Sequence, residues 1–259
     1  MKKLGFALGA GGSRGVAHIG FLQALEDAGV KPDYIVGSSM GAVVGGAYAA
    51  GIPLEVMKEA VFKLRLLDLI TPAKQKGGVF GTNKMRALIA KYIGEITFDK
   101  LRIPFHCVAV DMATQEVVEF SEGKVADAIV ASASIPGIFH PLMQDNMRLL
   151  DGGVLERVPA GRVKAMGADV VVAVDVLGWR TASEKVPATL GTLLETFDIM
   201  DNHRTLAYKE KHKKDFNLWL EPDLGEMSQY SLKQVKEAYE KGYELGKANA
   251  KRIKKKLVH

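Results

Sequence analysis

Hydrophobic positions along this chain fall into two patterns: short continuous runs, and runs in which apolar residues recur every three or four positions. Continuous β-branched runs are typical of buried parallel strands, and the wider spacing is typical of amphipathic helices. The first pattern predicts strands over 3–8, 33–37, 105–112, 116–120, 148–150, 169–176 and 216–220. The second predicts helices over 16–29, 38–51, 54–70, 83–95, 127–134 and 189–214, and a terminal helix from about Ser231.

The order of these elements predicts an α/β fold. Strands alternate with helices from the start of the chain, which indicates a mostly parallel sheet covered by helices on both faces. The sequence has no internal repeat, linker or low-complexity tract, and 259 residues suit one large α/β domain. We therefore predict a single domain over 1–259, which ends in a mainly helical region over 189–259.

Composition narrows the class of protein. The chain is 47% hydrophobic and 25% charged, as in a globular enzyme, and no run approaches the roughly 20 apolar residues of a membrane-spanning helix. Residues 1–12 superficially resemble a signal peptide, but their apolar stretch is very short and leads directly into glycines that the fold needs. We expect a cytoplasmic protein. Its single cysteine, Cys107, lies in an apolar run and is interpreted as a core residue.

The net charge of +5 is concentrated near the C-terminus, in residues 247–259. We interpret this segment as the solvated face of a terminal helix. Peripheral attraction to an anionic membrane surface is the alternative, since basic side chains contribute about 1 kcal/mol each near anionic headgroups. We expect no nucleic-acid partner, and the sequence does not indicate an oligomeric state.

One segment combines a strand, a tight turn and a helix around a serine. Residues 37–41, GSSMG, match G-x-S-x-G between the strand over 33–37 and the following helix. Such a nucleophile elbow holds the serine hydroxyl exposed in a strained turn, with Gly37 and Gly41 permitting the close approach of backbone. Ser39 is therefore the candidate nucleophile.

A glycine-rich segment, GAGGSRG over 9–15, follows the first predicted strand, and two interpretations compete for it. A dinucleotide-binding loop would need G-x-G-x-x-G and an acidic residue about 20 positions on. Arg14 stands where the third glycine would fall, and the next strand ends in Gly37 and Ser38 instead of an acid. An oxyanion hole of backbone N–H groups is favoured, because loops after neighbouring parallel strands meet at one edge of the sheet.

A nucleophilic serine needs a base. None of the histidines has the setting of a hydrolase histidine, His140 being the best of a weak set; they are His18, His106, His140, His203, His212 and His259. Asp151 is the stronger candidate, because it follows a short apolar strand and Gly152 and Gly153 let the backbone turn around its carboxylate. Partial burial would raise the pKa of that carboxyl and make proton transfer from serine feasible.

The three motifs, GAGGSRG, GSSMG and DGG, occur in this order, and ASASIPGIF over 131–139 precedes the third. In this combination the chain resembles the bacterial patatin-like phospholipase family over roughly residues 3–180. The resemblance implies a three-layer α/β/α fold and a catalytic dyad of Ser39 and Asp151, with no catalytic histidine, no cofactor and no metal. By the same matching, the oxyanion donors fall at Gly11 and Gly12, with Arg14 completing the loop.

The chain departs from the family pattern at two places. Ala10 stands where the family often has a third glycine, a methyl group that a negative φ would tolerate. After DGG the family commonly has asparagines, whereas this chain has VLERV over 154–158. Glu156 and Arg157 are expected to form a charged pair at the rim of the site.

The resemblance implies a serine acyl hydrolase of the phospholipase A, lysophospholipase or esterase type, which cleaves carboxylic esters of lipids through an acyl-enzyme. Its partner is then a lipid or acyl-ester substrate. Three rivals stay open: an acyltransferase that resembles malonyl-CoA:ACP transacylase, a non-catalytic lipid-binding regulatory module, and a dinucleotide-binding oxidoreductase. The helix over 54–70 is either a core-facing amphipathic helix or a lid that contacts membrane, with the glycines of 77–81 as its hinge.

Overall fold

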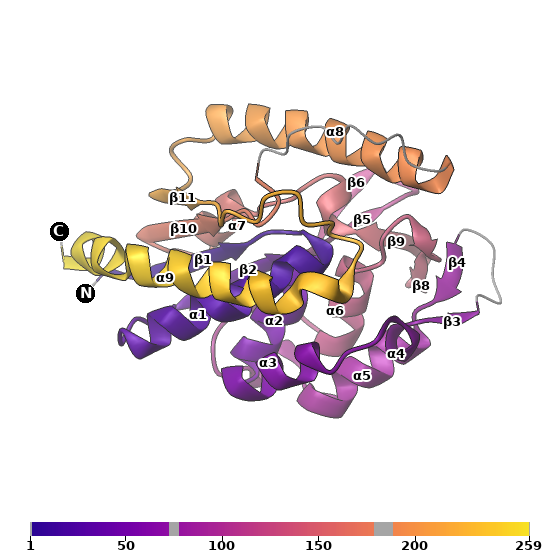
Figure 1. The fold of residues 1–259 in the computed structure, drawn as a ribbon, viewed down its shortest axis with the longest axis horizontal. Coiled ribbons are helices and arrows are strands. Elements are labelled where there is room, and N and C mark those ends of the chain that lie inside the picture. Colours follow the sequence, from indigo (N-terminus) through magenta and orange to yellow (C-terminus); the bar gives the residue numbers. More distant parts are fainter. Residues whose placement is uncertain (1, 73–77, 179–188, 259) are drawn as a thin grey trace.

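The structure is a computed structural model that describes residues 2–72, 78–178 and 189–258. Figure 1 shows three layers, with a central sheet between two sets of helices. The main sheet has the order β11-β10-β1-β2-β5-β9-β8, and β6 also pairs with β5. The strands in this sheet are β1 (Leu4–Leu8), β2 (Tyr34–Ser38), β5 (Phe105–Asp111), β6 (Glu116–Phe120), β8 (Leu142–Gln144), β9 (Met147–Asp151), β10 (Val170–Val174) and β11 (Leu218–Leu220).

Five of these strands, from β11 through β5, are parallel, and β6, β8 and β9 are antiparallel to their neighbours. The prediction of an α/β fold with a mostly parallel central sheet is confirmed. A small second sheet consists of β3 (Thr71–Pro72), β4 (Gly78–Gly81) and β7 (Gly137–Phe139).

Helices cover both faces of the main sheet (Figure 1). Seven lie on one face: α1 (Ala17–Asp27), α2 (Met40–Ala49), α3 (Leu54–Phe62), α4 (Leu66–Leu69), α5 (Asn83–Ile93), α6 (Val125–Ser132) and α9 (Val235–Val258). The other face carries α7 (Ala160–Ala165) and α8 (Thr189–Lys211). Short 3-10 turns occur at η1 (Gly12–Val16), η2 (Phe98–Lys100), η3 (Gly152–Val154) and η4 (Leu232–Gln234).

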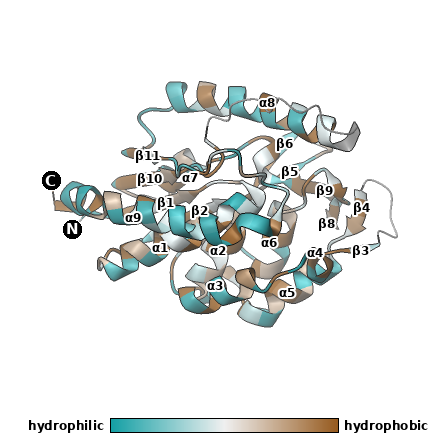
Figure 2. Ribbon diagram, viewed as in Figure 1, coloured by the Kyte–Doolittle hydropathy of each residue, from teal (hydrophilic) through white to brown (hydrophobic). Residues whose placement is uncertain are grey.

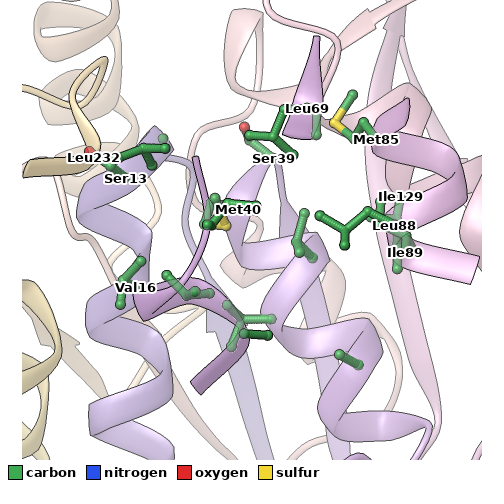
Figure 3. A pocket seen from close by; sticks show the side chains of 18 of the residues that line it. Ser13, Val16, Ser39, Met40, Leu69, Met85, Leu88, Ile89, Ile129 and Leu232 are labelled. Carbon is green, nitrogen blue, oxygen red and sulfur yellow. The ribbon is translucent and has the colours of Figure 1, made fainter. Parts of the chain in front are cut away.

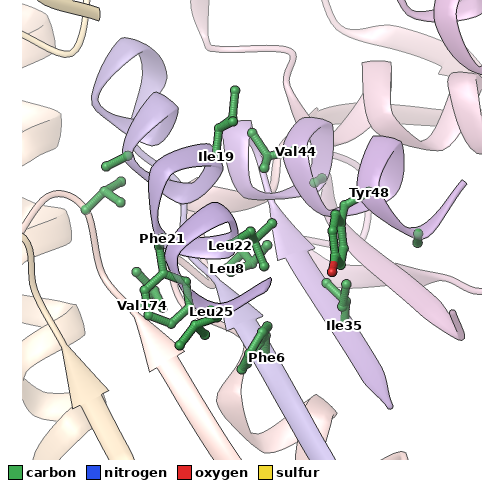
Figure 4. Close-up of a cluster of buried hydrophobic side chains, with 14 of the residues drawn as sticks. Phe6, Leu8, Ile19, Phe21, Leu22, Leu25, Ile35, Val44, Tyr48 and Val174 are labelled. Carbon is green, nitrogen blue, oxygen red and sulfur yellow. The ribbon is translucent and has the colours of Figure 1, made fainter. Parts of the chain in front are cut away.

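The core follows from the alternation of side chains along the strands. On β1, Phe6 and Leu8 point into the larger hydrophobic cluster beneath α1 and α2, which Figure 4 shows. Ala7 points the opposite way, into the cluster formed with α7. Hydrophobic residues accordingly mark the central strands, whereas α9 has many hydrophilic positions (Figure 2). Cys107 is fully buried in this core, and burial raises the pKa of its thiol.

The terminal helix α9 packs directly on α1. A Cβ added at Gly242 would lie 1.9 Å from the carbonyl oxygen of Ala17, and one added at Gly20 would lie 2.0 Å from that of Tyr239. Glycine at both positions therefore lets the two backbones touch. This contact joins a helix near the start of the sequence to the last helix. The basic residues of 247–258 lie mostly on the exposed side of α9.

The position of the site depends on which edge of β5 each of its three neighbouring strands pairs with. Strand β6 pairs with Cys107–Asp111 along one edge of β5. Strand β2 pairs with Phe105–Val108 and β9 with Ala109–Asp111, so both must use the other edge. Since Ser38 pairs with Val108 and Asp151 with Ala109, β2 and β9 meet end to end. The last residues of these two strands are therefore neighbours in space.

The prediction of one helix over 54–70 is wrong. The chain breaks between α3 and α4, where Arg65 is extended with φ −114° and ψ 151°. The Asp68 carboxylate accepts the Arg65 backbone N–H at 3.0 Å and so begins a new helix at Leu66. Residues 78–81, expected within a loop that serves as a hinge, are instead strand β4; residue 77 lies outside the described residues.

Within the described ranges, no helix is both long enough and apolar enough to cross a membrane.

Candidate active site

Ser39 occupies a strained turn between β2 and α2. Its φ of 53° and ψ of −121° lie in a region that serine rarely adopts. A Cβ at Gly37 would lie 2.5 Å from the backbone of Ala42, and a Cβ at Gly41 would lie 2.0 Å from the carbonyl oxygen of Leu8. Any larger residue at 37 or 41 would force the turn open, so both glycines belong to the elbow that the sequence predicted.

The Ser39 hydroxyl donates a hydrogen bond to Asp151 Oδ2 at 2.5 Å. Both side chains are buried, with 4% and 5% of their surface exposed. The other carboxylate oxygen, Oδ1, accepts the Gly153 N–H at 2.8 Å. A Cβ at Gly152 would lie 2.3 Å from the carbonyl oxygen of Val108, so the acid turn can pass this close to β5 only as glycine.

Burial raises the pKa of Asp151 to about 7. The hydrogen bonds from Ser39 and Gly153 lower this pKa, and the negative charge of Asp201 raises it. An acid with a pKa close to neutral can both take and return a proton at physiological pH. The geometry therefore pairs a strained serine hydroxyl with a carboxylate suited to act as a base.

The segment ASASIPGIF holds both members of this pair. The Ser132 hydroxyl accepts the backbone N–H of Ser39 at 2.9 Å, and the Ser134 carbonyl accepts the backbone N–H of Asp151 at 3.0 Å. The sequence marked this segment only by resemblance, and it gave Ser132 no role. Its position at the end of a predicted helix was the available signal, but the contact itself joins residues 93 positions apart.

The loop after β1 offers candidate oxyanion donors. The N–H of Ser13 donates to the Gln229 carbonyl at 2.9 Å, and that of Arg14 donates to the Gly11 carbonyl at 3.0 Å. Among the described residues, no acceptor is found for the N–H groups of Gly11 and Gly12. Gly12 also has a φ of 50°, which favours glycine, and lines the same cavity as Ser39. These two N–H groups are therefore candidate oxyanion donors.

The Arg14 side chain binds the backbone around the loop after β1. Its guanidinium is buried and donates to four backbone carbonyls. These carbonyls, at 2.8 to 3.1 Å, belong to Val176, Leu177, Gly225 and Met227. Arg14 thereby ties the loop after β1 to the segments that follow β10 and β11.

His18, His106, His140 and His212 bond to groups other than Ser39. Burial lowers the pKa of His18 to about 4, so its ring is neutral, and its Nε2 lies 2.8 Å from the Gly9 carbonyl. His106 contacts Glu119, His140 contacts the Pro141 carbonyl, and His212 contacts Asp215. His259 lies outside the described residues. The Ser39 hydroxyl instead donates its hydrogen bond to Asp151.

The charged pair expected at the rim does not form. Glu156 instead pairs with Arg162 at 2.7 Å. Arg157 is turned inward, and its guanidinium lies 2.7 Å from Asp175 and 2.8 Å from Asp201. The two residues diverge because Glu156 faces the start of α7, whereas Arg157 bridges the end of β10 and helix α8. Sequence spacing alone cannot show which of two adjacent charged residues turns inward.

Helix α8 is tied to the acid turn through Arg204. Its guanidinium donates to the Gly153 carbonyl at 2.7 Å and also to the carbonyl of Val154. It is paired with Asp201, the residue whose charge raises the pKa of Asp151. No local motif marks Arg204 or Asp201 as part of the site, because about 50 residues separate them from the DGG motif.

A cavity of about 260 Å³ begins at Ser39 and extends among the helices of the larger layer (Figure 3). The side chains lining the cavity are apolar except for Ser13, Ser39, Gln229 and the hydroxyl groups of Tyr92 and Tyr230. Its volume is just below the roughly 300–1,000 Å³ of typical small-molecule sites. The hydroxyl–carboxylate pair therefore adjoins a space suited to a hydrocarbon chain.

Comparisons with known proteins show which family and which solved structures this chain resembles. A family model described as "Patatin-like phospholipase" matches residues 6–163. An uncharacterized NTE family protein of Mycobacterium tuberculosis is 37% identical over 188 residues, which cover 72% of this chain and 51% of that protein. A lysophospholipase of Emericella nidulans is 32% identical over 184 residues, which cover 68% of this chain and 12% of the fungal protein. The chain thus spans about half the length, or less, of these relatives.

Two solved structures share the fold. VipD from Legionella pneumophila superposes with a TM-score of 0.68 at 13% identity, over 97% of this chain and 67% of that chain. The type III effector protein ExoU gives a TM-score of 0.51 at 15% identity, over 98% of this chain and 53% of the effector. At these identities the likeness concerns the fold alone.

Proposed function

Because the chain belongs to the patatin-like phospholipase family, whose model matches residues 6–163, we propose that it is a serine acyl hydrolase that cleaves carboxylic esters of lipids. The observation that carries the proposal is the 2.5 Å hydrogen bond from Ser39 to Asp151 beside an apolar cavity. In this proposal Ser39 is the nucleophile and Asp151 the base, with no histidine between them.

Acylation is the first half of the proposed reaction. The Ser39 Oγ–H bond breaks as Asp151 Oδ2 takes the proton and Oγ attacks the ester carbonyl carbon. The carbonyl oxygen becomes an oxyanion, which the N–H groups of Gly11 and Gly12 would stabilise. The positive end of helix α2, which starts at Met40, adds to this stabilisation. The tetrahedral intermediate then expels the alcohol, which receives the proton from Asp151, and an acyl-Ser39 ester remains.

Deacylation returns the enzyme to its starting state. A water molecule gives its proton to Asp151 and attacks the acyl carbon, passing through a second oxyanion. Ser39 Oγ leaves and takes the proton back, and the fatty acid is released. A raised Asp151 pKa supports this double use, because the carboxyl must both accept and return the proton at one pH.

The proposed substrate is a phospholipid or lysophospholipid, with simple acyl esters as further substrates. Support comes from the apolar lining of the cavity and from relatives named lysophospholipases in Emericella nidulans and Coccidioides immitis. The apolar cavity would bind the acyl chain, and the polar headgroup would remain in solvent at the mouth.

We also propose peripheral contact with an anionic membrane surface from the cytoplasmic side. Basic residues exposed on α9 would attract anionic headgroups by about 1 kcal/mol each; they are Lys247, Lys251, Arg252, Lys254 and Lys255. The single free cysteine, Cys107, is compatible with a reducing compartment. Co-sedimentation with anionic and with zwitterionic vesicles tests this contact, since equal binding to both would contradict it.

Replacement of either member of the dyad tests the catalytic proposal. Ser39→Ala and Asp151→Ala should each abolish turnover of p-nitrophenyl esters while circular dichroism stays unchanged. Full activity in Asp151→Ala would contradict the dyad. Product analysis with and without an added alcohol acceptor separates hydrolysis from acyl transfer, because a transferase would yield mainly the new ester.

A further inference from the structure

Three helices each contribute one stripe of side chains to the wall of the cavity beside Ser39, and residues of η1, α1, α4, α6 and the segments 133–139 and 229–232 line the rest of it. On α2 and α5 the lining residues recur every three or four positions, which defines a single helix face. Those on α2 are Met40, Val43, Val44 and Ala47, and those on α5 are Met85, Leu88, Ile89, Tyr92 and Ile93. Helix α3 and the residues after it contribute Met57, Ala60, Val61 and Leu64 with the same spacing. The cavity is therefore a channel that follows the helix axes.

Helices α2 and α5 run in the same sense, away from the catalytic edge of the sheet. Met85, at the start of α5, packs in one cluster with Ala133 and Phe139, and Figure 3 shows it at the same end of the cavity as Ser39. Just after Ile93, the end of α5, the Ile96 carbonyl accepts the N–H of Val125, which begins α6; the other end of α6, at Ser132, is the one that contacts Ser39. The channel thus has its mouth at Ser39 and its deep end at the opposite edge of the sheet.

Helix geometry gives the depth of the channel. From Ser39 to Ala47 the rise along α2 is about 12 Å, and from Met85 to Ile93 along α5 it is again about 12 Å, at about 1.5 Å per residue. A fully extended chain advances about 1.2 Å per bond, judged from the reach of extended polypeptide. The channel therefore holds about ten carbons of one extended acyl chain.

We propose that Ala47 and Tyr92 set the acyl-chain length, and that the site prefers a single chain of about ten carbons. This inference rests on the proposed function and names its substrate class. Ala47 is the last residue of α2 to line the channel, and its small side chain leaves the deep end open. Tyr92 lines both the channel and a groove on the outer surface, as do Ala60, Leu64 and Leu88, so these four residues form the wall between the two spaces. On α5, Tyr92 lies one turn nearer the deep end than Leu88.

The outer groove explains why the chain stops at this depth. Charged residues surround it, among them Glu55, Glu59, Lys63 and Lys91. Hydrocarbon that emerged there would meet charged groups and water, at the loss of the free energy gained from apolar burial. The preferred chain therefore ends inside the channel, behind Tyr92.

Ala47→Leu tests the deep end, because the added carbons would fill it. In this variant the ratio of C10 and C12 p-nitrophenyl ester turnover to C4 ester turnover should fall at least about fivefold relative to the unsubstituted protein. Ala50→Leu is the matched control: it makes the same change three residues along, at a partly buried residue that does not line the channel. The turnover of Ala50→Leu, divided by that of the unsubstituted protein, should be the same for esters of every chain length. All esters are measured at one detergent concentration.

Tyr92→Ala should have the opposite effect, since it opens the channel to the outer groove. Activity on C14 and C16 esters should rise relative to C10 by about threefold or more. The same length dependence should appear in the binding of free fatty acids to Ser39→Ala, measured by displacement of a fluorescent fatty acid.

The two readouts separate the channel inference from the proposed function. One outcome is that no ester of any length is hydrolysed, while fatty-acid binding depends on chain length and Ala47→Leu shortens the preferred chain. This outcome would contradict the hydrolase and support the channel. Turnover whose chain-length profile is the same in Ala47→Leu and Ala50→Leu would support the hydrolase and overturn the channel inference.

Discussion

Replacement of Asp151 by asparagine should stabilise the fold, and more so as the pH rises. Burial raises the pKa of Asp151 from 3.8 to about 7, so the folded protein holds this proton more tightly than the unfolded chain does. A group whose folded pKa is raised in this way lowers stability as the pH rises from about 4 to about 7. Asparagine keeps an oxygen for the Gly153 N–H and carries no charge, and so avoids this cost.

The magnitude follows from the two pKa values. One unit of pKa corresponds to about 1.4 kcal/mol, so the raised pKa of Asp151 lowers the free energy of unfolding by about 1.5 kcal/mol at pH 5, where the folded protein retains the proton, and by about 4 kcal/mol at pH 8. The pH-dependent part of the gain in Asp151→Asn is thus about 2.5 kcal/mol. In a protein of this size 1 kcal/mol shifts Tm by roughly 2–4 °C. The advantage in Tm should therefore grow by roughly 5–10 °C between the two pH values.

The assay is thermal unfolding of both proteins at pH 5 and pH 8, followed by circular dichroism. Asp111→Asn is the matched control, because Asp111 is also a buried carboxylate and belongs to neighbouring β5. Backbone N–H groups of Arg148 and Ala113 lower the pKa of Asp111, so its charge stabilises the fold at both pH values. Asp111→Asn should lower Tm by a similar amount at pH 5 and pH 8.

A Tm difference between Asp151→Asn and the unsubstituted protein that is the same at both pH values would refute this reasoning. It would mean that Asp151 has an ordinary pKa in the folded protein, and the argument that burial prepares it as a base would fail with it.

Three further predictions concern the site. Because Asp151 must be ionised to take the Ser39 proton, kcat/KM for a short ester should rise about tenfold per pH unit below a midpoint near 7. Asp201→Asn removes the negative charge that raises the Asp151 pKa, so the same pH profile should show a lower midpoint; an unchanged midpoint would contradict the coupling. Gly41→Ala would place a Cβ 2.0 Å from the Leu8 carbonyl oxygen, and should lower both Tm and ester turnover, whereas normal values of both would contradict the tight elbow.

Local patterns were enough to predict the main strands and the elbow. The strand, turn and helix around Ser39 lie within 20 residues, and hydrophobic spacing together with glycine determines each step. The valine-rich run of β10 was likewise evident because a central parallel strand is buried on both faces. These features depend on neighbouring residues, which a single sequence displays directly.

Contacts between distant residues could not be predicted in this way. Arg14 fits a glycine-rich loop motif in the sequence, yet its guanidinium bonds to carbonyls more than 160 residues away. Arg157 was expected at the rim and lies buried against Asp175 and Asp201. Periodicity also could not show the break at Arg65, because the apolar spacing continues through it and only the Asp68 carboxylate starts the new helix.

Covalent labelling by a fluorophosphonate tests the central claim most directly, since only an activated serine is expected to react. Peptide mass spectrometry of the labelled protein should find the adduct on Ser39, and Asp151→Asn should label much more slowly. An unlabelled Ser39, or an adduct on another serine that persists in Ser39→Ala, would contradict the account.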